Sequence, residues 1–288
     1  MQQDTSATSD FALDFLKDFA HQLGRRDIAL PPFPDVYARI LSALNDPNLS
    51  MDQLARMVTT APELCVRVLL LANSALMNRA GVEVIDVNVA VSRLGVTAVR
   101  NATVSIATKE LFVVPKGSPL RAELDCLHTM SVKTAAYAYT LATRSGRLDI
   151  RDDAMLTGLL HNVGSFYIIT KAEQFPEFAD EETTHAWVPG IGSALIDNWG
   201  FPESIARAVD EQDSVEANHV GQANLTDILI AGKLLAKISG ADSPETLLGE
   251  AAGSHCPALN KLGINMENIT QTMEELSDDV ESFMSALK

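Results

Sequence analysis

Apolar residues recur at three- and four-residue spacing along almost the whole chain, which is the periodicity of helices that bury one face. The alternation typical of half-buried strands is scarce. Near the start, Phe11, Phe15, Phe19 and Leu23 form one such stripe, and it ends at Gly24, a natural helix stop. The pattern predicts an all-α protein of about a dozen helices.

Capping residues, prolines and glycines predict where the helices of the first half begin and end. Ser50 starts a segment with the spacing of a capping box, and Pro62 suits the first turn of the following helix. Two further helices are expected over 87–94 and about 97–111, separated by Gly95.

The second half contains longer helices with similar boundaries. One is predicted over roughly 120–145, ending before a glycine. Asp152 and Asp153 are expected to cap the next helix, which the apolar pattern extends through Val163. Another long helix is predicted over about 217–239.

The last helix, about 266–287, carries a heptad-like seam with acidic residues on its other faces. The seam consists of Ile269, Met273, Leu276, Val280, Phe283 and Leu287. One interpretation is that this helix packs on its own domain. The other is that it forms a homodimer or binds a partner helix.

Composition and charge exclude several classes of protein. The 288 residues are 47% hydrophobic, and no apolar run is long enough to span a bilayer. The formal net charge of -16 disfavours binding to nucleic acid or to an anionic membrane. The polar start lacks the layout of a secretory signal, and the three cysteines lack metal-clip spacing, so a cytoplasmic protein is expected.

The most informative motif is the sequence GLLHNVGS at 158–165. It resembles the GLLHDIGK signature of the HD-type metal-dependent phosphohydrolases. Further segments resemble the hallmarks of the HDOD (HD-related output domain) family, in that family's order. They are LPPFP at 30–34, DP at 46–47, LANSA at 71–75, AVSRLG at 90–95 and WGFP at 199–202.

This resemblance implies an all-α, multi-helix HD-like fold in two helical lobes. The expected organisation is an N-terminal amphipathic helix over 1–24, an HDOD-like domain over 25–240 and a C-terminal helical extension over 241–288. Within the domain, the resemblance implies one lobe over 25–113 and a degenerate HD-like lobe over 120–240.

The resemblance also allows the metal ligands of an HD enzyme to be compared with this chain. His128 falls where the first metal histidine would lie, and His161 matches the histidine of the doublet. Asn162 stands where the doublet has its bridging aspartate. A neutral amide offers one weak carbonyl oxygen and none of the negative charge that holds a metal pair.

Other ligand positions depart from the family pattern as well. Pro189 replaces one expected histidine, Gln212 and Asp213 stand where a His-His pair often lies, and Gly232 is in line with the distal aspartate. We therefore predict no catalytic residue, no metal and no cofactor. What remains is a relic pocket, able to hold a small molecule or ordered water, formed by His128, His161, Asn162, Gln212 and Asp213.

By this resemblance the chain is a non-catalytic bacterial signal-transduction module that binds signalling proteins or a small ligand. Two alternatives stay open. One is a metal-dependent phosphohydrolase of nucleotides or phosphodiesters with a rebuilt ligand set, which would recruit Asp125, His185 or Asp213. The other is a sensor whose ligand occupies the relic pocket.

Overall fold

The structure is a computed structural model, and all regular structure in the part of the chain that it describes is helical. The all-α prediction is confirmed. The described residues are 4–25, 35–78, 81–111, 118, 120–171, 174–175, 181–239, 246, 249 and 256–287. The LPPFP motif at 30–34, and most of the predicted boundary between the lobes at 113–120, lie outside these ranges.

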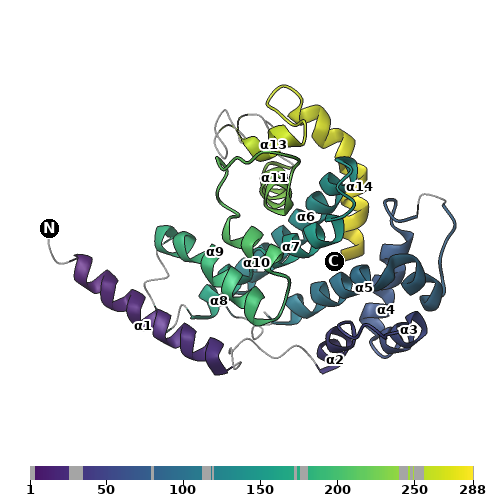
Figure 1. The fold of residues 1–288 in the computed structure, drawn as a ribbon, viewed down its shortest axis with the longest axis horizontal. Coiled ribbons are helices and arrows are strands. Elements are labelled where there is room, and N and C mark those ends of the chain that lie inside the picture. The colour runs from purple at the N-terminus through teal and green to yellow at the C-terminus, as the bar shows by residue number, and fades with distance from the viewer. Residues whose placement is uncertain are drawn as a thin grey trace.

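The first lobe packs three short helices around one long one (Figure 1). These helices are α2 (Asp35–Ala43), α3 (Met51–Thr59), α4 (Pro62–Asn73) and α5 (Val87–Leu111). Ser50 caps α3 through the predicted capping box, and Pro62 is the first residue of α4. Gly95, with φ 77°, kinks α5 where two helices were predicted, because only glycine adopts this left-handed conformation without strain.

The second lobe is organised by α6, which contacts α7 and α11 along its length. Its helices are α6 (Arg121–Arg144), α7 (Arg151–Leu160), α8 (Val163–Lys171), α9 (Glu181–Asn198), α10 (Glu203–Asp210) and α11 (Leu225–Ile238). Glycines let two pairs of helices approach closely. Gly158 of α7 lies against the backbone of Ala135 in α6, and Gly164 of α8 lies against Val188 and Gly192 of α9.

Three sequence-based boundaries in this lobe were wrong. Asp152 and Asp153 lie within the first turn of α7, whose N-cap is Ile150 without a side-chain hydrogen bond. The helix ends at Leu160, so the motif histidine begins a turn between α7 and α8. α11 starts at Leu225, because Asn224 accepts a hydrogen bond from the Asp227 amide and caps the helix, leaving 217–224 as a loop.

The helices at both ends of the chain pack onto the second lobe, and the last one also contacts the first lobe. In α1 (Asp4–Arg25), Phe15 is fully buried and its ring lies edge-on to the Trp187 ring of α9. At the other end, α13 (Pro257–Lys261) packs on α11, and α14 (Ile269–Leu287) packs on α6 and α4.

Four of the six residues of the α14 seam, namely Ile269, Leu276, Val280 and Phe283, are buried within this chain. Phe283 is fully buried and stacks on Tyr139 of α6, with ring centroids 4.6 Å apart. A second copy would reach these side chains only if α14 left α6. A homodimer through this helix therefore stays a prediction that requires another face of α14.

The two lobes meet where α5 contacts α7. There the fully buried Asn101 donates a hydrogen bond from Nδ2 to the backbone oxygen of Asp152, 2.8 Å away. In the described part of the chain, no helix combines the length and the apolar character that crossing a membrane requires.

Candidate functional site

A cavity of about 490 Å³ opens in the second lobe, around the turn between α7 and α8. Its walls come from α6, this turn, the start of α8, α9, the segment after α10, and α11. The lining side chains are Leu127, Met130, Thr134, His161, Asn162, Ser165, Thr184, His185, Val188, Gln212, Asp213, Val215, Ile230, Lys233, Leu234 and Lys237.

His161 follows α7 directly and is only 3% exposed. Its Nδ1 lies 2.7 Å from the backbone oxygen of Gly158. Because a carbonyl oxygen only accepts, Nδ1 carries the hydrogen and the lone pair is left on Nε2. Burial, reinforced by the positive charge of Lys233, lowers the pKa of His161 to about 3, so the imidazole is neutral near pH 7.

Asn162 is held by hydrogen bonds to α6. Its Nδ2 donates to the backbone oxygen of Leu127 at 3.3 Å and to the Ser131 hydroxyl at 3.2 Å. Both contacts use the amide as a donor, which a carboxylate at this position would be unable to do. The side chain thus joins the motif turn to α6 as a structural amide.

Lys233 of α11 places an ammonium group in the cavity wall. Its Nζ lies 2.8 Å from Gln212 Oε1 and 2.7 Å from Asp213 Oδ1. Gln212 in turn donates from Nε2 to the backbone oxygen of His161 at 3.2 Å. Burial lowers the pKa of Lys233, and its pairing with Asp213 opposes that shift. One chain of contacts therefore connects α11, the segment after α10 and the motif turn.

The structure brings together four of the five residues predicted for the relic pocket, namely His161, Asn162, Gln212 and Asp213. His128 is half-buried on α6 but does not line the cavity. Successive helical residues are rotated by about 100°, so His128 is turned away from the face that carries Leu127, Met130 and Thr134.

Sequence reasoning missed other lining residues. Gly232, aligned with the distal aspartate, packs instead against the α6 backbone, and the next residue, Lys233, faces the cavity. A lysine within the otherwise apolar stretch 228–235 was the available signal. On α9, His185 and Val188 line the cavity, whereas Pro189 does not.

These residues do not fit an HD-type metal centre. Hard divalent cations require several anionic oxygen ligands. Asp213 is the only carboxylate among the described residues that line the cavity, and it is paired with Lys233. The Lys233 ammonium would also repel a metal ion placed beside it. Among the described residues there is no group of three or more His, Cys, Asp or Glu that could hold a metal.

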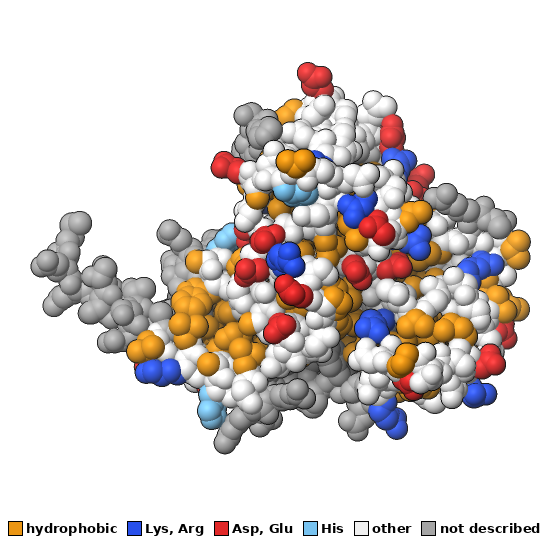
Figure 2. Space-filling view, viewed as in Figure 1, with side chains coloured by type: hydrophobic (Ala, Val, Ile, Leu, Met, Phe, Trp, Pro, Cys, Tyr) orange, Lys and Arg blue, Asp and Glu red, His pale blue; other side chains and the backbone are white. Residues whose placement is uncertain are grey.

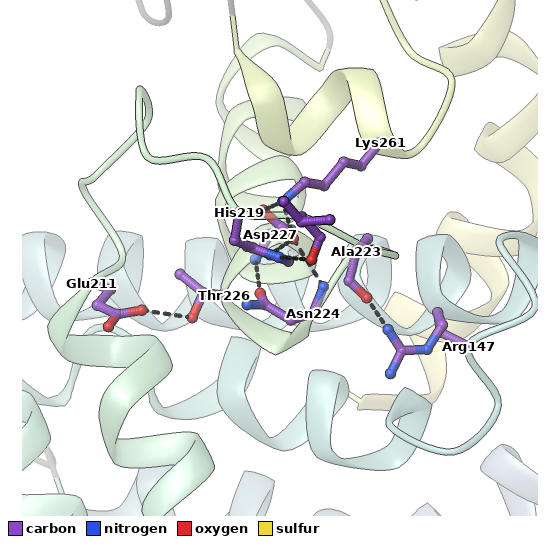
Figure 3. Close-up of polar contacts among 9 residues, drawn as sticks. Arg147, Glu211, His219, Ala223, Asn224, Thr226, Asp227 and Lys261 are labelled. Atoms are coloured by element: carbon purple, nitrogen blue, oxygen red, sulfur yellow. Dashed lines mark hydrogen bonds and ion pairs between the residues drawn. The ribbon is translucent and has the colours of Figure 1, made fainter.

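A second polar cluster surrounds Asp227 at the start of α11 (Figure 3). Its carboxylate is 4% exposed and accepts hydrogen bonds from the Asn224 amide at 2.9 Å, His219 Nε2 at 2.7 Å and Lys261 Nζ at 3.2 Å. Nearby, an Arg147 side-chain nitrogen donates to the backbone oxygen of Ala223. The cluster joins α13 and the loop before α11 to the second lobe, so its role is structural.

The first lobe contains a groove of about 520 Å³ between α2 and α3. Ile40 and Met57 are among its apolar side chains, and Arg39 and Arg56 also line it. Figure 2 shows hydrophobic side chains gathered at the lower right of this face, over the first lobe. No described residue that lines the groove carries a group that would act on a substrate.

An all-α fold of two helical lobes is the class that these features define, and comparison with known proteins identifies the family. The family model for the HDOD domain matches residues 30–215. The chain belongs to the HDOD domain family.

Solved structures of similar fold cover nearly the whole chain. A "Putative metal-dependent phosphohydrolase" from Shewanella amazonensis SB2B is 21% identical with a TM-score of 0.71, and the match covers 97% of this chain and 100% of that one. An HDOD domain protein with unknown function from Geobacter sulfurreducens is 24% identical with a TM-score of 0.65, covering 99% and 98%. A "Putative signal transduction protein" from Marinobacter aquaeolei VT8 is 25% identical with a TM-score of 0.60, covering 96% and 66%.

A curated relative of the chain is an uncharacterized protein of Treponema pallidum (strain Nichols). It is 23% identical over 199 aligned residues, and the match covers 62% of this chain and 37% of that protein. The chain thus spans little more than a third of the length of this relative.

Proposed function

We propose that this chain is a bacterial signal-transduction module that binds protein partners and a small ligand, and that its HD-like site catalyses no reaction. The observation that carries the proposal is the position of Lys233. Its ammonium nitrogen lies 2.7 Å from Asp213 and lines the same cavity as His161 and Asn162. A positive charge thus stands where an HD enzyme needs anions.

The chemistry of the remaining ligands supports the same proposal. His161 offers one lone pair, and Asn162 uses its amide nitrogen to bond α6. An HD-type enzyme depends on a metal ion to lower the pKa of bound water and to stabilise charge on phosphate. Without a carboxylate to bridge and hold the metal ion, the site can neither lower the pKa of bound water nor stabilise charge on phosphate in this way.

Elemental analysis combined with an activity screen tests this proposal. Protein purified without chelators should contain no stoichiometric divalent metal. Phosphatase and phosphodiesterase substrates supplied with Mn²⁺, Mg²⁺ or Zn²⁺ should show no turnover above buffer. One or two metals per chain, or turnover that a chelator abolishes, would overturn the proposal.

A phosphohydrolase with a rebuilt ligand set is the second candidate, and one observation favours it. His185 and Asp213 line the same cavity as His161. The third group suggested for such a set, Asp125, is exposed on α6 and lies outside the cavity lining. If the screen detects turnover, Asp213→Ala and His185→Ala should abolish it, whereas Asp125→Ala should leave it unchanged.

Exposed apolar side chains in the first lobe support the binding of protein partners. Five of the ten large hydrophobic side chains that are exposed in the described part of the chain lie within 66–89, and Ile85 is 81% exposed. Soluble proteins seldom concentrate exposed apolar groups in this way unless another molecule covers them.

A matched pair of variants tests this surface. We expect Ile85→Glu to prevent retention of a signalling protein that binds the wild-type chain in a pull-down. Leu148→Glu, which changes an exposed hydrophobic residue of the second lobe, should leave that retention intact. Equal retention by both variants would place the partner elsewhere.

A further inference from the structure

We propose that the cavity around Lys233 binds a small organic anion, with a phosphate or carboxylate group carried on an apolar body. This inference rests on the proposed function, because it assigns a ligand to a site that we infer holds no metal. The size of the cavity, its charge and one buried hydroxyl group all favour such a ligand.

The cavity has the size and composition of a small-molecule site. Its volume of about 490 Å³ falls within the range of about 300–1,000 Å³ typical of ligand pockets. One part of the wall is apolar, with Leu127, Met130 and Ile230 among its side chains. Amides and hydroxyls lie in the same lining, including those of Asn162 and Ser165. Such a site suits a molecule with both an apolar and a polar end.

The charge of the lining selects an anion. Lys233 and Lys237 contribute two ammonium groups, and Asp213 contributes the single carboxylate among the described residues of the lining. Since Asp213 is paired with Lys233, no second carboxylate among the described lining residues is left to balance Lys237. This local excess stands out in a chain with a formal net charge of -16, whose surface on average repels anions.

Thr134 supplies an independent sign that a ligand belongs in the cavity. Its side chain lines the cavity and is fully buried, yet its Oγ1 forms no hydrogen bond with the described residues. Elsewhere on α6, the hydroxyls of Thr129 and Thr143 donate to the backbone oxygen four residues earlier. A buried hydroxyl without a partner is costly, and a ligand oxygen would satisfy it.

A cation is the least suitable occupant. The Lys233 ammonium already lies 2.7 Å from Asp213, so an incoming cation would have to displace it. An anion gains from Lys237 without breaking that pair and accepts a hydrogen bond from Thr134. The charges of the lining and the unpaired hydroxyl of Thr134 therefore both favour an anion that carries oxygen atoms.

Four probes that differ in charge test the proposal by isothermal titration calorimetry and protein NMR. Phenyl phosphate and benzoate carry an anion on a ring, whereas benzyl alcohol is neutral and benzylamine is a cation. We expect both anions to bind with shifts of resonances from the cavity residues, and to bind about tenfold or more tightly than benzyl alcohol or benzylamine. If neither anion binds at the cavity, or if benzylamine binds as tightly, the inference is wrong.

Variants of the wall locate the binding. Lys237→Ala and Thr134→Val should each weaken phenyl phosphate binding about tenfold. Thr140→Val is the matched control, because Thr140 is also fully buried on α6 with an Oγ1 that bonds no described residue, but it does not line the cavity. Neither valine variant should lower the melting temperature of the free protein, because each removes a buried polar group without a partner. Equal affinity of all three variants for phenyl phosphate would overturn the proposal.

The outcome also separates this inference from the proposed function. Binding of phenyl phosphate without hydrolysis supports both. Binding followed by metal-dependent hydrolysis keeps the anion site but ends the non-catalytic proposal. Failure of both anions to bind, with no metal and no turnover detected, removes the anion site and leaves the non-catalytic proposal intact.

Discussion

The ammonium nitrogen of Lys233 lies 2.7 Å from a carboxylate oxygen of Asp213, and this pair joins α11 to the segment that follows α10. Lys233 also bonds Gln212, which holds the turn containing His161. The pair therefore does two things at once. It fixes the wall of the cavity, and it places a positive charge beside the histidine of the HD-like motif.

Restoring a metal site should require more than restoring the doublet aspartate. Asn162→Asp alone should destabilise the protein by about 2 kcal/mol, because a carboxylate would face the backbone oxygen of Leu127 where the amide now donates. The Lys233 ammonium should still prevent Mn²⁺ binding. The double variant Asn162→Asp/Lys233→Asp should bind Mn²⁺ and gain thermal stability from it, since two carboxylates would join His161 and Asp213.

Calorimetry and thermal unfolding with and without MnCl₂ measure this difference. Asn162→Asp/Lys237→Asp is the control, because it adds the same charge at an exposed position of the cavity wall. If the single variant binds Mn²⁺ as tightly as the double variant, Lys233 is not what excludes the metal.

The buried His161 should make the protein sensitive to acid. Its pKa is about 3 in the folded chain, against about 6.5 when unfolded, so between these values the unfolded state binds a proton that the folded state does not. The stabilising effect of a neutral His161 is complete above about pH 6.5 and is lost as the pH falls toward 3. Below pH 6.5, the unfolding free energy of the wild type should fall more steeply than that of His161→Gln, by up to about 1.4 kcal/mol per pH unit.

Urea unfolding of both proteins at several pH values between 7.5 and 4.5 measures these slopes. At pH 7.5, where the histidine is neutral in both the folded and the unfolded state, the difference in unfolding free energy between the two proteins gives the effect of the substitution apart from titration. Parallel loss of stability in the two proteins would show that His161 does not titrate as its burial requires.

The crossing of α8 and α9 should tolerate no side chain at Gly164. A Cβ there would collide with the backbone oxygen of Val188 and lie 3.0 Å from the Gly192 nitrogen. We expect Gly164→Ala to lower the free energy of unfolding, measured by chemical denaturation, by about 1–3 kcal/mol or more. Gly190→Ala on α9 should be neutral or stabilising by up to about 1 kcal/mol, because its nearest atom, a carboxylate oxygen, is 3.9 Å away. Equal effects of the two alanines would contradict this account of the crossing.

Among the carboxylates of the second lobe, Asp227 should be the one whose substitution lowers stability most. Asp227→Asn would leave the Lys261 ammonium, which is 12% exposed, without a counter-charge, and we expect it to lower the unfolding free energy by about 3 kcal/mol. Glu203→Gln breaks an exposed pair with Arg207 and should leave stability within experimental error. If Asp227→Asn proves as mild as this control, the contacts of Asp227 are not essential to the loop and α13.

Local signals predicted most of the helices, because capping and backbone geometry depend on neighbouring residues. Ser50, Pro62 and Gly95 were placed correctly on this basis. The same reasoning failed at Asn224, where the apolar pattern did not reveal that a capping residue starts α11 eight residues later than predicted.

The sequence alone determined the helical class, the resemblance to the HDOD family and the loss of the doublet carboxylate, because each depends on the identity or spacing of nearby residues. Only the tertiary structure decided which side chains share the cavity. His128 turns away on α6, whereas Lys233, 72 positions after His161, reaches the cavity wall from α11. The direction of a helical side chain relative to a distant helix depends on how the helices cross, and this crossing is set by close contacts such as those at Gly158 and Gly232.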